Sequence, residues 1–352
     1  MQSGVFHTNY AKDMQLRPTW VMRARLIFLI ILLVVLPFVA NAYWLNLANQ
    51  IMLFSITAVG LNLLVGFTGQ ISIGHAAFVA LGAYTAALLS TRLNIPFPLD
   101  VPFAMIVAGA VGLIFGLPSA RLKGLYLAIA TLAAQEIVLW FLKHLDLFVP
   151  NVGESISLVP TWAHEQFLAN RARADFNYYW VILFFLTLVV IFSVNLVRSR
   201  VGRAFVAVRD QDIAAQVIGI DVNRTKLIAF MISSMIAGLS GALVAHYRGI
   251  VNWERFTVDT SIAVLSMLII GGLGRVSGSI YGAIFVTVLP ALLTQFGLLF
   301  RDILPDVNRV IPYVQQGAFG IAIIFFLIKE PEGIAKMWKD VKDYFKLWPF
   351  SY

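Results

Sequence analysis

The sequence predicts an all-α, polytopic helical membrane protein with about eight to ten transmembrane helices. Of its 352 residues, 60% are hydrophobic and only 12% are charged, whereas a soluble domain carries about 25% charged residues. The 66 residues from Leu26 to Thr91 contain no Lys, Arg, Asp or Glu. A water-soluble fold of this size could not hide so much apolar sequence, because a large part of any fold stays exposed.

Ten apolar windows are candidate spans, because about 20 residues are needed to cross the hydrocarbon core. A signal peptide is the alternative for the first window, but we favour an uncleaved helix because apolar spans continue throughout the chain. Glycines crowd the junction of two later windows, so one of that pair could be re-entrant. The windows are 26–44, 47–65, 71–91, 101–119, 124–142, 178–197, 226–247, 258–274, 276–297 and 311–328.

Lys and Arg residues predict the orientation. With a cytoplasmic N-terminus and alternating spans, 18 of the 26 basic residues lie on the cytoplasmic side. The net charge of +8 is therefore a topology signal and gives no evidence for nucleic-acid binding. We expect a cytoplasmic segment at 1–25, a transmembrane domain at 26–328 and a cytoplasmic amphipathic tail at 329–352 that lies on the bilayer surface. An outer loop at 143–177 and an inner loop at 198–225 interrupt the transmembrane domain.

The inner loop carries the signals of a short helix. Asp210 is a candidate N-cap, and Asp212 would place negative charge in the first turn, where the helix dipole favours it. Gly219 is a candidate left-handed residue after the helix, with Ile220 available for the apolar contact that follows. A helix of two turns is marginal alone. It either lies on its own protein or on lipid headgroups, or docks on a partner.

A second candidate site interrupts the charge-free run at GFTGQISIGHAAF, residues 66–78. Its glycines either form a close helix-packing seam or mark unwound backbone, which is tolerated at membrane depth only where it is buried or lines a cavity. We expect a tightly packed break or reversal, and we interpret its histidine as an interhelical donor more than a ligand. The candidate residues are Gly69, Gln70, Ser72, Gly74 and His75.

Three further residues are candidates for the membrane interior. Glu136 is the one acid expected within a span, where a charge costs about 2.5–3.5 kcal/mol. It either faces a pathway or a partner subunit, or reaches the outer surface by snorkelling. Gly272 and Gly274 begin a motif that misses the dinucleotide-binding spacing by one residue and follows a span, so we interpret it as tight packing or a reversal.

The sequence also excludes several chemistries. There is no cysteine, which excludes disulfides and thiolate metal sites. The five histidines are scattered, with none paired at i, i+4, so no metal-site spacing occurs. No acid–histidine pair that resembles a catalytic dyad is visible, which disfavours an integral-membrane enzyme. An ion-coupled carrier is also disfavoured, because one intramembrane acid is a sparse supply of ion-binding groups.

Three blocks of the chain carry a resemblance to a known family, namely GLNLLVGFTGQISIGHAAFVALGAYTAALL (60–89), GRAFVAVRDQDIAAQVIGIDVNRTKLIAFMISSMIAGLSGAL (202–243) and SMLIIGGLGRVSGSIYGAIF (266–285). They closely resemble the permease subunits of branched-chain amino acid ABC importers, and most of all the longer of their two permease types. Within the second block, Ala214-Ala215-x-x-x-Gly219 resembles the core of the cytoplasmic coupling loop, although Ile213 stands where the family usually has Glu.

The resemblance implies one permease subunit of the bacterial inner membrane that works by alternating access. The implied partners are a second homologous permease, two ATPase subunits that bind ATP and Mg²⁺, and a periplasmic binding protein. This chain has no phosphate loop and is expected to carry no cofactor. The helix at 210–219 would sit in an ATPase groove, with Arg203, Arg209 and Asp210 at its rim. Urea or short amides are the alternative substrates, since the outer loop at 148–160 lacks the expected Thr-Gly-Gly-rich stretch.

Overall fold

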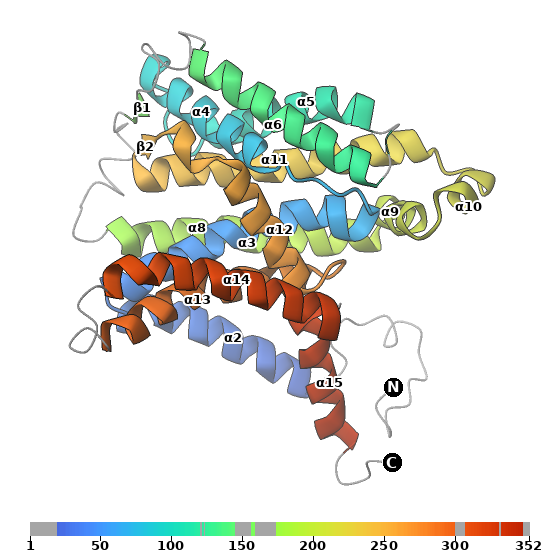
Figure 1. Ribbon diagram of the computed structural model, residues 1–352. Coiled ribbons are helices and arrows are strands. Elements are labelled where there is room, and N and C mark those ends of the chain that lie inside the picture. The colour runs from blue at the N-terminus through green and yellow to red at the C-terminus, as the bar shows by residue number, and fades with distance from the viewer. Residues whose placement is uncertain are drawn as a thin grey trace.

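The computed structural model describes residues 20–119, 122, 124–144, 156–158, 174–299, 307–330 and 332–347. Most of these residues form helices that run roughly along one direction (Figure 1). The longer helices are α2 (Trp20–Val39), α3 (Ala42–Thr68), α4 (Ala76–Arg92), α5 (Asp100–Ser119), α6 (Leu125–His144), α8 (Ala174–Arg198), α11 (Val222–Arg248), α13 (Val276–Leu299) and α14 (Val307–Lys329). The shorter elements are α9 (Arg200–Asp210), α10 (Asp212–Val217), η2 (Trp253–Arg255), α12 (Val258–Gly271), α15 (Gly333–Leu347), β1 (Ile156–Ser157) and β2 (Ile250–Val251).

The chain is a multi-pass membrane protein. Within the described residues, six helices are long and apolar enough to span a bilayer, namely α3, α5, α6, α8, α11 and α13. Shorter apolar helical stretches occur at Ile27–Val39, Ala76–Arg92 and Tyr313–Lys329. Of the two windows at the glycine-rich junction, 258–274 does not form a full span, in line with the re-entrant alternative. Its helix, α12, has 14 residues, or about 21 Å at 1.5 Å per residue, which is too short for a core of about 30 Å.

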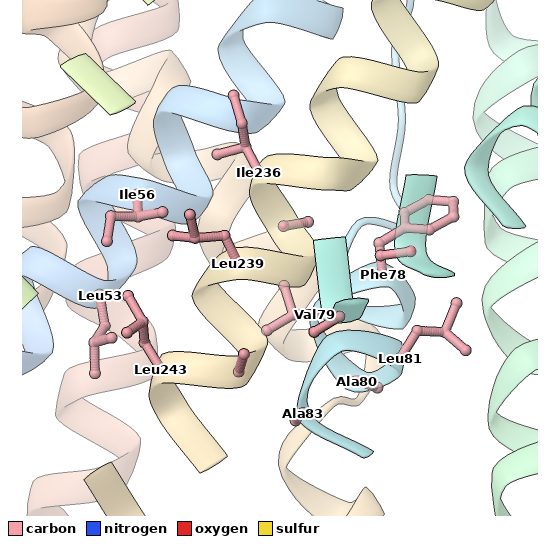
Figure 2. Packing of buried hydrophobic residues seen from close by; sticks show 14 of the residues in the cluster. Leu53, Ile56, Phe78, Val79, Ala80, Leu81, Ala83, Ile236, Leu239 and Leu243 are labelled. Carbon is pink, nitrogen blue, oxygen red and sulfur yellow. The ribbon is translucent and has the colours of Figure 1, made fainter. Parts of the chain in front are cut away.

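Helix α11 lies at the centre of the bundle, against α3, α4 and α5. In Figure 2, Leu239 and Leu243 of α11 extend toward Ile56 and Leu53 of α3. On the α4 side the two backbones touch, because a Cβ on Gly82 would lie 2.1 Å from the carbonyl oxygen of Gly238. Lipid provides no hydrophobic force between helices, so such close contacts hold a membrane bundle together.

Buried hydroxyl groups add interhelical hydrogen bonds to this packing. Thr57 of α3 donates to the hydroxyl of Ser240 on α11 at 2.7 Å. Ser233 of α11 donates to the carbonyl of Gly60 at 2.7 Å. Both bonds join the same pair of helices, which fixes their register as well as their separation.

The two ends of the bundle differ. One end carries α9, α10, the turn between α12 and α13, and the start of α15, whereas the other carries β1 and β2 (Figure 1). The strands pair antiparallel, with Ile156 opposite Val251. Most of the expected outer loop at 143–177 lies outside the described residues, including much of the 148–160 stretch. The end with α10 and α15 is the one expected to be cytoplasmic.

Two helices begin inside the bundle. Helix α3 ends at Gly69, which is left-handed with φ +70°, and α4 begins only at Ala76, so the span expected at 71–91 starts as non-helical chain. On the opposite side, α11 ends at Gly249 with φ +70°, and α12 begins at Val258. The two starts touch, since the Ala76 N–H donates to the Ser261 hydroxyl at 2.9 Å. The bundle thus contains two half-helices that enter from opposite ends.

Candidate functional site

The inner loop at 198–225 contains two helices where the sequence predicted one. Ser199 caps α9 by accepting from the Gly202 N–H at 3.3 Å. Phe205 and Val208 are buried side chains of α9, so the helix packs against the bundle through these residues and ends only at Asp210. The expectation that Asp210 caps the next helix is therefore wrong. Asp210 is the last residue of α9, and its carboxylate accepts from Arg209 at 2.9 and 3.0 Å.

The end of α10 matches the expectation from sequence. Gly219 is left-handed, with φ +90°. Its N–H donates to the Gln216 carbonyl at 3.0 Å. The Ile220 N–H donates to the Ala215 carbonyl at 3.0 Å. These two bonds form the Schellman motif that glycine favours after a helix. Asp212 lies in the first turn of α10, also as expected.

Helix α10 presents an apolar surface to solvent. Ala215 is buried against the protein, whereas the side chains of Ile213, Val217 and Ile218 are 71%, 83% and 74% exposed. Ala214 is exposed on the same short helix. Arg203, on the neighbouring α9, is exposed and donates to the Arg198 carbonyl at 3.0 Å. An exposed apolar cluster at a loop outside the apolar spans is typical of a protein-contact surface.

Arg209 connects this loop to the break after α3. Its Nη1 donates to the Gly66 carbonyl at 3.0 Å. In a continuing helix that carbonyl would accept from Gln70, but the Gln70 N–H turns to Leu64 instead. The guanidinium therefore satisfies a carbonyl left over at a helix C-terminus, where positive charge is favoured. A Cβ at Gly69 would lie 3.2 Å from Arg209 Cγ, so the contact is close.

Asn62 ties the same region to the turn between α12 and α13. Its side-chain nitrogen donates to the Arg275 carbonyl and to the Ser279 hydroxyl, both at 2.8 Å. Its side-chain oxygen accepts from the Gly274 N–H at 3.0 Å. All three bonds are made by one side chain that is 1% exposed. Sequence reasoning missed Asn62, although an asparagine within the apolar window 47–65 was the available signal.

The backbone conformation and close contacts of the turn between α12 and α13 explain why it contains glycines. Gly272 and Gly274 have positive φ angles of +117° and +73°, which favour glycine. A Cβ on Gly274 would lie 2.9 Å from Arg209 Nη1, and one on Gly66 would lie 2.4 Å from the Gly274 N–H nitrogen. Both expected junction glycines therefore belong to a reversal at the α10 end of the bundle, and neither lies at the helix starts inside it.

The tail begins at the same turn. Arg275 pairs with Glu332 at 3.0 Å, and Lys336 pairs with Glu332 at 3.1 Å. The hydrogen bond from Lys336 and the nearby charge of Arg275 hold the pKa of Glu332 below its usual value. A Cβ on Gly333 would lie 2.5 Å from the Gly272 nitrogen. Met337, Trp338, Val341 and Tyr344 of α15 are exposed, which leaves an apolar face for the expected surface location.

Most of the break packs inside the bundle, as expected, although Gly69 and Ile71 are exposed. Gln70 donates to the Thr68 hydroxyl at 3.0 Å and to the Lys226 carbonyl at 3.3 Å. A Cβ on Gly74 would lie 1.9 Å from the Thr131 carbonyl oxygen on α6, which only glycine permits. Ser72 and His75 are each 1% exposed, and their side chains have no hydrogen-bond partner within the described structure.

A cavity of about 380 Å³ joins the two candidate regions at the α10 end. Thr68, Gly69 and Gln70 of the break form one side, and residues 208–213 of the inner loop form another. The start of α6 and Lys226 complete it. The sequence predicted the coupling residues and the break residues as two separate sites, but they line the same cavity.

Glu136 lies away from this site. It is exposed on α6 and lines neither this cavity nor a second cavity that lies at the β2 end of the bundle. Its neighbour Gln135 is fully buried, donates to the Phe256 carbonyl at 3.2 Å and accepts from the Ser261 hydroxyl at 2.7 Å. Consecutive helical residues point about 100° apart, so the inward residue is Gln135. Sequence reasoning missed Gln135 because, in this span, only the charged Glu136 was treated as informative.

One acid–histidine pair does exist, contrary to the expectation from sequence. His246 of α11 hydrogen-bonds Asp100 of α5, and the side chains are 3% and 0% exposed. The Tyr178 hydroxyl donates to the His246 carbonyl at 2.7 Å. The two partners are 146 positions apart, so no local motif could reveal them. They join α5, α8 and α11 at the β2 end and line neither cavity.

Residues 43–327 match the model of a protein family described as branched-chain amino acid transport system / permease component. The chain is 32% identical over 290 residues to the high-affinity branched-chain amino acid transport permease LivM of Escherichia coli K12, covering 77% of this chain and 68% of that protein.

Two further relatives extend the comparison. The permease BraD of Pseudomonas aeruginosa is 24% identical over 296 residues, which cover 80% of this chain and 91% of BraD. A probable ABC transporter permease, y4mJ of Sinorhizobium fredii, is 31% identical over 238 residues, with coverages of 64% and 66%. No solved structure matches the chain.

Proposed function

The chain belongs to the family of permease components of branched-chain amino acid transport systems, and we propose that it forms one half of the pathway of an importer for these amino acids. It would work by alternating access, driven by ATPase subunits on other chains. The observation that carries the coupling proposal is the hydrogen bond from Arg209 to the Gly66 carbonyl. That bond links the exposed inner loop to a break inside the bundle.

The exposed apolar face of α10 supports docking on an ATPase. Ile213, Val217 and Ile218 would fill a groove of that subunit, and Asp210 and Arg203 would lie at its rim. When the ATPases close, α9 and α10 would move as a pair. Arg209 would carry this movement to residues 66–70. Through the Gly274 contact and Asn62, the same movement would reach α12 and α13.

The remaining partners follow from the family. We infer a second homologous permease of the LivH type, two ATPase subunits that bind ATP and Mg²⁺, and a periplasmic substrate-binding protein. The protein would lie in the bacterial inner membrane with both termini cytoplasmic, in line with the distribution of basic residues. Residues 1–25 and 329–352 would form the cytoplasmic segments around the transmembrane domain at 26–328. Glu136, exposed on α6, would face the second permease or the lipid.

Reconstitution tests this proposal. Proteoliposomes that contain the chain with its partner permease and ATPases should take up L-leucine, L-isoleucine or L-valine only when ATP and the loaded binding protein are present. Urea and aromatic amino acids serve as comparison substrates. Uptake by this chain alone, driven by an ion gradient, would contradict the proposal. Saturable uptake of urea without uptake of any branched-chain amino acid would contradict its substrate assignment.

A further inference from the structure

A second cavity, of about 300 Å³, lies at the end of the bundle opposite α10. This volume is at the lower limit of the range of about 300–1,000 Å³ that is typical of small-molecule sites. Its walls come from α3, α4 and α11 and from the segment that leads into α12. Leu53, Phe54, Val79, Val244 and Val264 give it an apolar lining.

The entrance to this cavity is charged. Arg248, Glu254 and Arg255 line both the cavity and a shallower hollow of about 550 Å³ beside it. Neither arginine forms an ion pair within the described residues, and the Glu254 carboxylate accepts from Asn252 at 3.2 Å. Arg248 lies over the Tyr247 ring, 5.6 Å from its centroid. Two arginines without an ion pair among the described residues and one carboxylate, at the mouth of an apolar cavity, match the charges of a zwitterion with an apolar side chain. The break at 69–75 offers no such charges.

The inner end of the cavity is closed where the half-helices meet. Ala76, the first residue of α4, and Thr260, in the first turn of α12, both line it. The Ala76 N–H donates to Ser261, which donates to the buried Gln135. This chain of hydrogen bonds joins α4, α12 and α6 across the path toward α10. Half-helices that meet near the middle of a bundle are typical of substrate sites in transporters.

We propose that this cavity is a low-affinity station for a zwitterionic α-amino acid with an aliphatic side chain. Arg248 and Arg255 bind its carboxylate and Glu254 binds its ammonium group. The aliphatic part lies on Leu53, Val79 and Val264. Weak binding suits a pathway, because the solute must also leave. The inference rests on the proposed function, since it names where this permease holds the imported solute. The contact between α4 and α12 is then the barrier that coupling opens.

A binding experiment without the binding protein tests the site. The full-length chain, co-purified with its partner permease and ATPases in nanodiscs, is incubated with tritiated L-leucine, and bound label is measured by scintillation proximity. Leucinamide lacks the carboxylate and 4-methyl-2-oxopentanoate lacks the ammonium group, so both should compete more weakly than leucine. Arg255→Gln should weaken leucine binding about five- to tenfold and reduce the advantage of leucine over leucinamide. Glu254→Gln should reduce the advantage over the oxo acid.

Matched variants separate the site from general damage. Val264→Trp fills the cavity and should abolish binding, whereas Ile262→Trp, on the same helix but exposed and outside the cavity, should not. Arg92→Gln removes an arginine that lines neither cavity and should leave binding unchanged. Equal binding by the wild type, Arg255→Gln and Val264→Trp overturns the inference. So does a phospholipid that co-purifies in the wild type, is lost in Val264→Trp and is not displaced by leucine.

Uptake measurements on the same complex distinguish failure of this inference from failure of the proposed function. ATP-dependent uptake by the wild type, together with unchanged uptake by Val264→Trp, would refute the cavity and keep the permease assignment. Absence of ATP-dependent uptake by the complete wild-type system would refute the proposed function itself.

Discussion

Arg209 and Gly66 are separated by 143 positions in sequence, yet the Arg209 guanidinium donates to the Gly66 carbonyl at 3.0 Å. The arginine belongs to the surface loop and the carbonyl belongs to the last turn of a buried helix. The bond also lies beside Gly274, at the turn between α12 and α13. Any displacement of α9 must therefore move the break, the turn, or both.

Replacing Arg209 should uncouple transport. Arg209→Gln removes the charge that satisfies Gly66, so we expect ATP-dependent uptake to fall at least about tenfold, the effect of about 1.4 kcal/mol, while ATP hydrolysis continues. Uptake and hydrolysis are measured together in proteoliposomes. Arg200→Gln is the control, since Arg200 is an exposed arginine at the start of the same helix and has no role in the proposed coupling. Wild-type uptake by Arg209→Gln would refute the link.

The end of α10 should depend on glycine. Proline at position 219 cannot adopt φ +90° and removes the N–H that bonds Gln216, so Gly219→Pro should abolish uptake at normal abundance. Gly219→Ala meets no atom within 4 Å and should cause a milder loss, because a left-handed non-glycine residue costs about 1–2 kcal/mol.

Asp210→Ala should leave α10 formed, since Asp210 does not cap it. A helix signal lost in Asp210→Ala but kept in Gly219→Pro would contradict this assignment.

The apolar face of α10 should be required for ATPase binding. Val217 is 83% exposed, so Val217→Asp should leave the fold intact while it weakens association with the ATPase about tenfold or more. Co-purification and the thermal unfolding temperature of the isolated permease measure the two effects separately. Asn223→Asp introduces the same charge at an exposed position near the start of α11 and should retain the ATPase. Undiminished co-purification of Val217→Asp would show that another surface docks.

Close backbone contacts predict which glycines are essential. Gly74→Ala would bring a methyl group to within 1.9 Å of the Thr131 carbonyl, and Gly82→Ala to within 2.1 Å of the Gly238 carbonyl. Each should destabilise the folded protein by about 1–3 kcal/mol through overpacking. Gly317→Ala is the control, since no atom lies within 4 Å of its Cβ position. Thermal unfolding in detergent tests the ranking, and equal unfolding temperatures for all three variants would refute it.

Local features were predictable because they depend on neighbours within a few residues. The left-handed Gly219 follows from a glycine placed after a short helical pattern, and the break at Gly69 follows from glycine and polar residues in an apolar run. Asp210 is not a cap because α9, which packs through the buried Phe205 and Val208, continues to Asp210 itself. Packing of α9 against the bundle, more than the local capping preference of Asp210, therefore decides where α9 ends.

The sequence by itself determined the helical membrane class, most spans, the break at Gly69, the end of α10 and the family. Only the tertiary structure decided that Arg209 reaches Gly66, that Gln135 points inward beside an outward Glu136, and that Asp100 meets His246. It also assembled the cavity that Arg248, Glu254 and Arg255 line. The reason is physical: periodicity and capping act within one or two turns, whereas these contacts depend on how closely glycine allows distant helices to approach.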